Sequence, residues 1–319
     1  MVSAQPCALL QWWKPRVTLM GRDYRGGPGP QSAGTRAQCL QAIKMIYDCF
    51  TYAGEEDLLT LRLRTLSGHV GRFVIAEATR TFAGQPKPLR YDPAPFAEWA
   101  HQIDYLVVDD LQATPRSAWD NEYHQRNALA RGLASAAADD WVLLSDVDEI
   151  PRPQALRDFR PGRYLSAVLH QRMFYYALNN EMVRSGDPRD LPWRMARLCT
   201  VQALRQWFGS LQVLRSYKGT GPLRSMKRSW NQLRTQHIAH GGWHFSYLMT
   251  PEQILDKIRS FSHQELNVPK YTDVAHIRES LRQRRDIFGG DREFAQVPVD
   301  GSLPAPLLQD PERFARWVI

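Results

Sequence analysis

Three carboxylates follow directly on an apolar segment in WVLLSDVDEIP, residues 141–151. In an extended chain alternate side chains point to the same side, so we expect Asp146 and Asp148 to face the same space. Two such carboxylates can hold one hard divalent cation, Mg²⁺ or Mn²⁺, which keeps coordination positions open for phosphate oxygens. An Asp-x-Asp pair alone is more often a solvated turn, but its position after a buried strand favours binding. We therefore predict that Asp146 and Asp148 are metal ligands.

A second candidate group lies late in the chain, in GGWHFS, residues 241–246. The paired glycines permit a close approach of two backbones because they carry no Cβ. Trp243 offers a flat face for stacking, and a ring nitrogen of His244 can bind a metal ion. A single histidine is more often structural, but these neighbours favour a ligand role. We predict His244 as a further metal ligand and Trp243 as a stacking residue of the same site.

The segments that must position these groups alternate between strand and helix patterns. β-Branched and aromatic residues predict strands at KMIYDCFTY, RFVIAEA, DYLVVDD and DDWVLLSDVDEI, which begin at residues 44, 72, 104 and 139. Acidic residues 55–57 suit the N-terminus of an amphipathic helix after the first strand. Ser117 is the expected N-cap of a long helix that reaches residue 138, and Thr250 that of a helix in TPEQILDKIRSFSHQEL.

This alternation predicts an α/β fold with a mostly parallel, Rossmann-like central sheet flanked by helices. Ligands of such sheets bind beyond the carboxyl ends of the strands, where Glu77, Asp146 and Asp148 are expected. No linker is evident after residue 42, so we predict one domain over residues 42–319. Residues 1–41 are rich in Gly, Pro and polar residues, and we predict that they form a flexible extension.

Charge and composition narrow the class of protein. The net charge is +8, and a basic surface attracts phosphates and anionic surfaces. We find no nucleic-acid-binding motif and therefore expect no nucleic-acid partner. The four cysteines form no CxxC pair, which argues against a structural zinc site. Neither a membrane-spanning apolar run nor a signal peptide is recognisable, so we expect a cytoplasmic protein with at most peripheral membrane contact.

Several motifs in a fixed order carry a resemblance to a known family. They are YDCFTYAGEEDLLTLRLRTL, RFVIAEATRTFAGQPKPL, LLSDVDEIPRP and GGWHFSYL, and they fall within residues 43–270. Together they resemble glycosyltransferase family 17. The resemblance implies a GT-A-like fold, a nucleotide-sugar donor, a glycan acceptor, inversion at the anomeric carbon, and Mn²⁺ or Mg²⁺ as cofactor. It favours N-acetylglucosamine from UDP-GlcNAc as the transferred sugar, in β-1,4 linkage.

The resemblance also suggests which residues bind the donor. Arg126 and Asn127 precede the Asp-x-Asp segment by one helix, and GT-A enzymes have such a pair near the nucleotide. A surface salt bridge to Glu122, one helical turn earlier, is the alternative for Arg126.

Four further residues complete the predicted donor site: Glu77, Arg80, Trp243 and Lys257. Glu77 stands at a strand end and binds the nucleoside, or else pairs with Arg80 on a surface loop. Lys257 meets the diphosphate, or else lies on a polar helix face. Trp243 and Arg80 are taken as donor-binding as well. Lys87, in GQPKPL, belongs to a proline-stiffened loop that covers the donor or is simply exposed.

The base that takes the acceptor proton must be a carboxylate within hydrogen-bond reach of the hydroxyl. Glu149 and Glu265 are our catalytic candidates. Glu149 adjoins the metal pair, although it can instead brace the metal ligands. Glu265, together with His263, can orient the acceptor. Glu181 and Asp187 are alternative bases from the second half of the chain.

Two rival functions share parts of this pattern. A metal-dependent phosphotransferase or nucleotidyltransferase also uses paired acids with phosphates, but the sequence has no GxxxxGK[ST] loop. A non-catalytic carbohydrate-binding protein would use the aromatic residues for stacking. Metal-dependent hydrolysis of a nucleotide sugar would reject the second rival.

Overall fold

The computed structural model describes residues 44–216 and 230–319. These residues belong to one compact unit. The extension predicted at residues 1–41 lies outside the described residues, so that boundary stays a prediction.

Strands and helices alternate in the first half of this unit, as expected. The strands are β1 Ile46–Thr51, β2 Arg72–Ala78, β3 Ile103–Val108, β4 Trp141–Leu144, β5 Glu149–Pro151, β6 Ser166–Tyr175, β7 Asn180–Ser185, β8 Arg197–Thr200, β9 Thr235–Ser246 and β10 Arg292–Gln296. The longer helices are α1 Glu56–Leu66, α2 Ala118–Ala128, α5 Leu211–Ser216, α7 Pro251–Ser260 and α8 Val274–Gln283. The described residues also form the 3-10, π and shorter α-helices η1 Ala94–Gln102, η2 Leu129–Leu133, α3 Pro153–Arg157, α4 Val201–Ala203, η3 Leu204–Phe208, η4 Gln264–Leu266, α9 Pro306–Gln309, α10 Pro311–Phe314 and η5 Ala315–Trp317.

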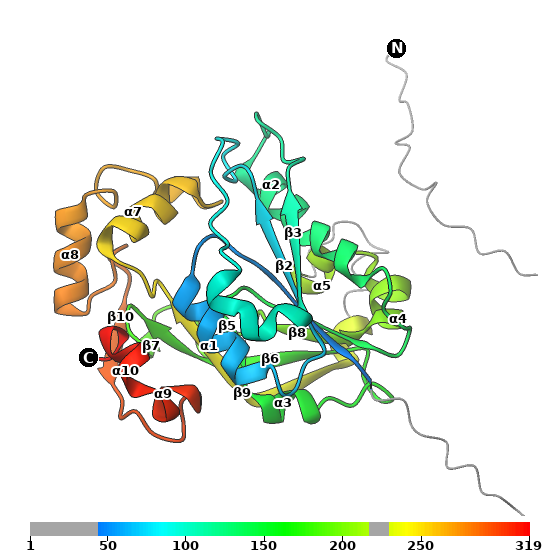
Figure 1. The fold of residues 1–319 in the computed structure, drawn as a ribbon. Coiled ribbons are helices and arrows are strands. Elements are labelled where there is room, and N and C mark those ends of the chain that lie inside the picture. The colour runs from blue at the N-terminus through cyan, green and yellow to red at the C-terminus, as the bar shows by residue number, and fades with distance from the viewer. Residues whose placement is uncertain (1–43, 217–229) are drawn as a thin grey trace, which may run out of the picture. The chain divides into compact units, whose positions relative to one another are not determined.

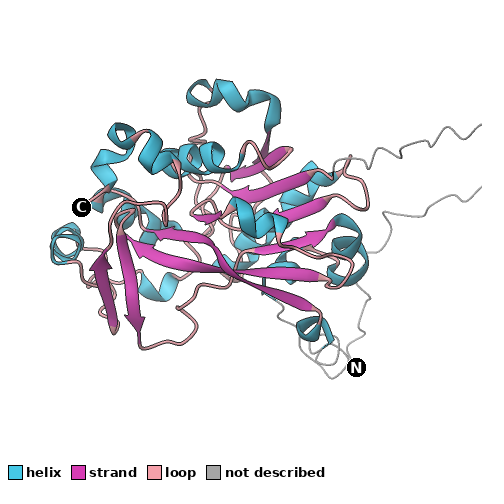
Figure 2. Cartoon of the chain, turned by 90° about the horizontal axis from the view of Figure 1, so that it is seen from below, coloured by secondary structure: helices cyan, strands magenta, loops and turns pink. Residues whose placement is uncertain are grey.

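The strands form one sheet in the order β10-β7-β6-β8-β4-β1-β2-β3, with β9 beside β6 and β5 beside β9 (Figure 1). Strands β4, β1, β2 and β3 are parallel to one another, and β6 and β9 are also parallel. Strand β8 runs antiparallel between β4 and β6. Figure 2 shows the long strands crossing the molecule with helices around them. The predicted α/β class is thus confirmed, including the largely parallel sheet with flanking helices.

Both faces of the parallel strands are buried, because alternate side chains enter two different cores. Phe50, Phe73 and Leu143 pack on one face against α1, η1 and α3. Cys49 and Val74, whose side chains point the other way, pack against η2, η3 and α5. A third core joins α7 and α8 to the end of β6 and to β7. A sheet covered on both faces leaves its strand ends as the place for a site.

Two predicted elements end earlier than expected. The helix after Ser117 has the expected N-cap, with Asp120 completing a capping box, but it changes to a 3-10 helix after Ala128. Gly132 lies there against Val74 of β2, where a Cβ would come within 2.5 Å of Val74 Cγ1. The helix that begins after Thr250 ends at Ser260, so His263 and Glu265 are not part of it.

One buried ion pair joins the first helix to the sheet. Arg62 of α1 and Asp48 of β1 have no exposed side-chain surface, and two hydrogen bonds connect them, from Nε at 2.8 Å and from Nη2 at 2.5 Å. The Arg62 guanidinium also lies over the ring of Phe50, with its Cζ 4.5 Å from the ring centre. Removing one partner of such a pair leaves a buried charge without compensation.

We therefore expect Arg62→Met to lower the free energy of unfolding by about 3–5 kcal/mol. Arg64→Met on the same helix is the control, because its ion pair with Asp310 is about one-third exposed on both sides. It should cost less than about 1 kcal/mol. Urea denaturation of both variants measures the difference, and equal losses would contradict the role given to Arg62.

Candidate active site

The three carboxylates of the central motif lie at the carboxyl edge of the sheet, in a turn between two strands. Strand β4 ends at Leu144, and β5 begins at Glu149. The backbone N–H of Glu149 donates to the carbonyl of Asp146 at 3.0 Å, which closes the turn. Our expectation that an extended chain aligns Asp146 with Asp148 was therefore wrong. In the turn the nearest partners of Asp146 and Asp148 differ, although the charge of Asp148 still acts on Asp146.

Arg62 of α1 fixes this turn by hydrogen bonds. Its guanidinium donates to the carbonyl oxygens of Asp146 at 3.0 Å and Glu149 at 2.9 Å, and to the hydroxyl of Ser145 at 2.6 Å. These donors satisfy backbone groups that a tight buried turn would otherwise leave unpaired. The position of the carboxylates thus depends on a side chain of α1.

Asp146 is bound by two arginines. Its Oδ2 accepts a hydrogen bond from Arg215 Nη2 at 2.7 Å, and Arg126 Nη2 lies 3.5 Å from Oδ1. Burial favours a raised pKa, but the charges of Arg215 and Arg126 outweigh it and hold the pKa of Asp146 below its ordinary value. Each carboxylate oxygen thus faces an arginine, and the role of Asp146 as a metal ligand stays a prediction.

Glu149 is the most enclosed acid of the motif, with no exposed surface. Arg215 pairs with both of its carboxylate oxygens, Trp193 Nε1 donates to Oε1 at 2.5 Å, and the N–H of Asp146 donates to Oε2 at 3.1 Å. A base needs an oxygen that an acceptor hydroxyl can reach. Glu149 therefore has the bracing role that the sequence left open, and not that of the base.

Asp148 faces a different set of side chains. Its Oδ2 lies 3.5 Å from His244 Nε2 and 3.9 Å from Lys257 Nζ. Burial opposes ionisation, yet the charges of His244 and Lys257 keep the pKa of Asp148 well below its ordinary value. Conversely, burial disfavours the charged imidazole, but Asp148 raises the pKa of His244. The structure thus brings together Asp148, His244 and Lys257, as the sequence predicted.

His244 reaches Asp148 because β5 pairs antiparallel with β9, in a register that sets Glu149 opposite His244. Gly242 makes this pairing possible. Its φ of 139° lies in a region that residues with side chains rarely adopt, and a Cβ there would be 2.2 Å from the carbonyl oxygen of Ile150. The close approach expected from the paired glycines is confirmed.

Trp243, the neighbour of His244, points into the core instead of the site. Only 3% of it is exposed, its Nε1 donates to the carbonyl of Ser302 at 2.9 Å, and Arg152 covers its ring. Alternation along β9 explains this, since adjacent side chains face opposite ways. The predicted stacking role of Trp243 in donor binding was therefore wrong.

Glu77 fixes the loop that follows β2. Its buried carboxylate accepts hydrogen bonds from Lys87 Nζ, from the N–H groups of Arg90 and Tyr91, and from the hydroxyl of Tyr105 at 2.8–3.1 Å. The ion pair is with Lys87 instead of Arg80, whose guanidinium donates to the carbonyl of Gly84. No described contact links Glu77 or Arg80 to Asp148, so donor binding by either stays a prediction.

Asn127 acts through the backbone of α5. Its side-chain oxygen accepts a hydrogen bond from the N–H of Gln212 at 2.9 Å, and Arg126 donates to the side chain of the same Gln212 at 2.6 Å. The alternative ion pair of Arg126 with Glu122 is also present, at 2.8 Å. The Arg126–Asn127 pair therefore positions α5, which carries Arg215.

Arg215 is a site residue that the sequence analysis missed. It begins the basic stretch RSYKGTGPLRSMKRSWNQLR, which has the composition of a solvated basic face. Yet only 4% of Arg215 is exposed, since two carboxylates surround it. Residues 217–229 of that stretch lie outside the described part of the chain. The one available signal was the preceding apolar pattern of residues 211–214, which marks a packed helix.

The other predicted acids of the second half form separate pairs. Glu181 binds Arg172 at 2.6 Å, and Arg189 lowers the pKa of Asp187 to about 2. Glu265 binds His263 at 2.6 Å with 65% of its side chain exposed. A hydrogen bond from His263 lowers the pKa of Glu265, which makes it a weaker base.

A divalent cation fits this site through two residues. Among the described residues no three His, Cys, Asp or Glu side chains lie close enough together to hold a metal ion. However, His244 Nε2 lies 3.5 Å from Asp148 Oδ2, so these two atoms face each other closely enough to bind one cation. One carboxylate and one imidazole suit Mn²⁺ or Mg²⁺ when phosphate oxygens and water supply the other positions. Asp148 and His244 are therefore the residues that would hold the cation.

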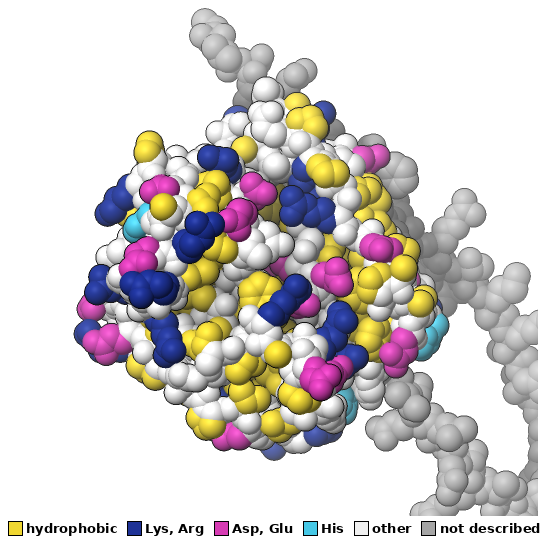
Figure 3. All heavy atoms as spheres, turned by 60° about the vertical axis from the view of Figure 1, so that its left-hand side comes forward, with side chains coloured by type: hydrophobic (Ala, Val, Ile, Leu, Met, Phe, Trp, Pro, Cys, Tyr) yellow, Lys and Arg dark blue, Asp and Glu magenta, His cyan; other side chains and the backbone are white. Residues whose placement is uncertain are grey.

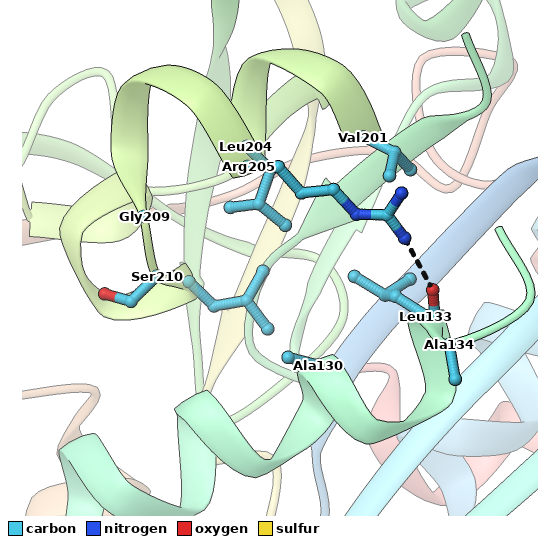
Figure 4. Close-up of a pocket in the computed structure, with 9 residues that line it drawn as sticks. Ala130, Leu133, Ala134, Val201, Leu204, Arg205, Gly209 and Ser210 are labelled. Carbon is cyan, nitrogen blue, oxygen red and sulfur yellow. Dashed lines mark hydrogen bonds between the residues drawn. The ribbon is translucent and has the colours of Figure 1, made fainter. Parts of the chain in front are cut away.

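The surface and the pockets add little to this assignment. Basic and acidic side chains are interleaved on the face drawn in Figure 3, without a large patch of one sign. A mostly apolar pocket of about 200 Å³ lies between η2 and η3, where Arg205 donates to the carbonyl of Leu133 (Figure 4). None of the predicted site residues lines it.

Within residues 44–216 and 230–319, no helix combines the length and apolarity needed to cross a membrane.

Gly242→Ala should destabilise the protein, because the added Cβ must push β5 away from β9. We expect a loss of about 1–3 kcal/mol in the free energy of unfolding from the backbone conformation alone. Gly162→Ala is the matched control, since nothing lies within 4 Å of its added Cβ. Thermal unfolding of both variants tests this, and an unchanged midpoint for Gly242→Ala would contradict the close approach.

Arg215→Gln should also destabilise the fold, by about 3–5 kcal/mol, because two carboxylates lose their buried partner. Arg189→Gln removes an arginine with 88% of its side chain exposed and should cause no measurable change. Chemical denaturation compares the two. If Arg215→Gln leaves the free energy of unfolding unchanged, Asp146 and Glu149 do not depend on the charge of Arg215.

Two solved structures show partial likeness in fold. Glucosyl-3-phosphoglycerate synthase from Mycobacterium tuberculosis, solved with Mn²⁺, UDP-glucose and glycerol 3-phosphate, matches with a TM-score of 0.38 and 13% identity over 83% of this chain and 91% of that chain. The glycosyltransferase GlyE of Streptococcus pneumoniae matches with a TM-score of 0.31 and 10% identity over 61% and 46%. At these scores neither likeness bears on the site.

Proteins of similar amino-acid sequence are more informative than these two structures. A human β-1,4-mannosyl-glycoprotein 4-β-N-acetylglucosaminyltransferase is 25% identical over 94% of this chain, and the rat enzyme of the same name is 25% identical over 82%. The matches cover only 65% and 52% of the lengths of those two proteins. Residues 36–194, which include α1, α2 and the carboxylate turn (residues 145–149), match the model of glycosyltransferase family 17. The chain therefore belongs to glycosyltransferase family 17.

Proposed function

We propose that this protein transfers N-acetylglucosamine from UDP-GlcNAc to a hydroxyl group of a glycan, with inversion at the anomeric carbon. Family membership supports sugar transfer. The names of the human and rat relatives support N-acetylglucosamine, a β-1,4 linkage and a mannose-containing acceptor.

The observation that carries the proposal is the cluster of Asp148, His244 and Lys257 at the carboxyl edge of the sheet. Lys257 Nζ lies 3.9 Å from Asp148 and comes from α7, in the second half of the chain. Its charge can stabilise a diphosphate as negative charge develops on the leaving oxygen. When bound, Mn²⁺ or Mg²⁺ would add further neutralisation of the diphosphate.

The arginines beside this cluster set its shape. Arg126 and Arg215 hold Asp146 at the edge of the site, with 36% of its side chain exposed. An exposed, firmly held carboxylate is suited to accept hydrogen bonds from sugar or ribose hydroxyls. In the transfer step the acceptor oxygen bonds to the anomeric carbon while the bond from that carbon to the diphosphate oxygen breaks.

Asp148→Ala should abolish transfer and binding together. Without this carboxylate the site loses a metal ligand, so the melting temperature should no longer rise when UDP and Mn²⁺ are added. Asp291→Ala, at a position with 66% of its side chain exposed, should keep both the activity and the shift. Screening nucleotide sugars for Mn²⁺-dependent transfer to a β-1,4-mannosyl oligosaccharide provides the activity measurement.

Retained turnover in Asp148→Ala would reject the metal-assisted mechanism. Absence of transfer or hydrolysis by the unmodified protein with every nucleotide sugar would reject the proposed function. The cytoplasmic location expected from the sequence stays a prediction.

A further inference from the structure

The proposed reaction needs a carboxylate that can take a proton, and most acids near Asp148 are already bound to donors. Asp146 and Glu149 bind Arg215. Glu122 binds Arg126 and the hydroxyl of Ser262. Asp148 itself adjoins His244 and Lys257, which stabilise its charged form. A proton acceptor among these residues would have to give up an ion pair first.

Glu55 is a further carboxylate at this edge of the sheet. Strands β1 and β4 are parallel neighbours, so the segment after Thr51 and the turn after Leu144 leave the sheet side by side. Gly54, with a φ of 106°, turns the chain between β1 and α1. Glu55 follows at once, and it stands two turns of helix before Arg62, which grips the carboxylate turn.

The Glu55 side chain is not used to cap its own helix. A carboxylate at the N-cap usually accepts a hydrogen bond from the second or third N–H group of the helix. Glu55 is the N-cap residue of α1, but it makes no such bond. One oxygen, Oε2, accepts from the N–H of Ala53 at 2.8 Å. In the described parts of the chain no side chain donates to Glu55 and no ion pair holds it.

The charges that act on Glu55 come from the proposed site. Burial raises the pKa of Glu55, the charge of Lys257 lowers it, and the charge of Asp148 raises it, with a raised pKa as the result. Tyr52, a titratable neighbour, stays protonated because burial and Glu55 both raise its pKa. The side chain of Arg90 also lies near, since a Cβ on Gly54 would be 2.6 Å from Arg90 Cδ. A carboxylate with a raised pKa binds a proton more tightly, which suits a base.

We propose that Glu55 is the general base that takes the proton from the attacking hydroxyl of the acceptor. In this step the hydroxyl oxygen bonds to the anomeric carbon, the bond between that carbon and the diphosphate breaks, its electron pair leaves with the diphosphate, and the proton passes to the Glu55 carboxylate. One oxygen of Glu55 is fixed by Ala53, which orients the carboxylate without neutralising it. This inference rests on the proposed function.

Glu55→Gln keeps the size of the side chain but cannot accept the proton. With UDP-GlcNAc, Mn²⁺ and a β-1,4-mannosyl oligosaccharide as probes, we expect kcat to fall by about 10²–10⁴-fold while KM for the donor changes little. The rise in melting temperature on addition of UDP and Mn²⁺ should stay as in the unmodified protein. The matched control is Glu56→Gln, one residue along, where 56% of the side chain is exposed.

Glu55→Asp serves as the second variant, because it keeps a carboxylate at a shorter reach. It should retain more activity than Glu55→Gln. It should also keep the loss of kcat/KM at acidic pH that protonation of the base causes, whereas the residual activity of Glu55→Gln should lack this loss.

The possible outcomes test the role of Glu55 separately from the proposed function. Activity of Glu55→Gln within about threefold of the unmodified protein, or an equal loss in Glu56→Gln, overturns the role of Glu55 and leaves the proposed function intact. Loss of the UDP-dependent thermal shift in Glu55→Gln also overturns it, since the residue would then bind the donor. If the unmodified protein transfers no sugar from any nucleotide sugar, the proposed function fails and this inference fails with it.

Discussion

The contact between Arg62 and the turn at residues 145–149 holds in place the three carboxylates on which the site is built. A buried guanidinium must satisfy all its donors, and Arg62 does so with the Asp48 carboxylate, the Ser145 hydroxyl and carbonyl oxygens of the turn. The first strand, the first helix and the carboxylate turn thereby become one rigid unit. Because burial of this charge is tolerated only with every partner present, the turn cannot move without a large loss of stability.

Three carboxylates within four residues serve different purposes because they face different neighbours. Glu149 is buried against Arg215 and Trp193 and braces the turn. Asp146 is held by arginines but stays at the surface of the site. Asp148 adjoins the imidazole of His244 and the ammonium group of Lys257. Glu149 therefore supports the structure of the turn, whereas Asp146 and Asp148 face the space for ligands. Proton transfer is left to an acid from another element.

Much of the fold followed from local patterns. The strands at residues 46–51 and 72–78, the helix after Glu55 and the N-caps at Ser117 and Thr250 were all predictable, because alternation and capping are properties of neighbouring residues. Placing the motif at the carboxyl edge also followed, since parallel strands with helices on both faces share that edge. The pairing of Asp148 with His244, almost a hundred residues apart, was predicted from residue types and a family resemblance.

The amino-acid sequence by itself determined the class of fold and the edge of the sheet at which the predicted residues Asp148, His244 and Lys257 come together. Tertiary structure alone decided which acids are free. Arg215 looked like part of a solvated basic stretch, and Trp243 looked like a stacking surface, until packing buried both. Glu55 looked like a helix-capping acid, although its side chain caps nothing. The reason is physical: burial and ion pairing depend on partners brought from distant segments, and local sequence does not encode those distances.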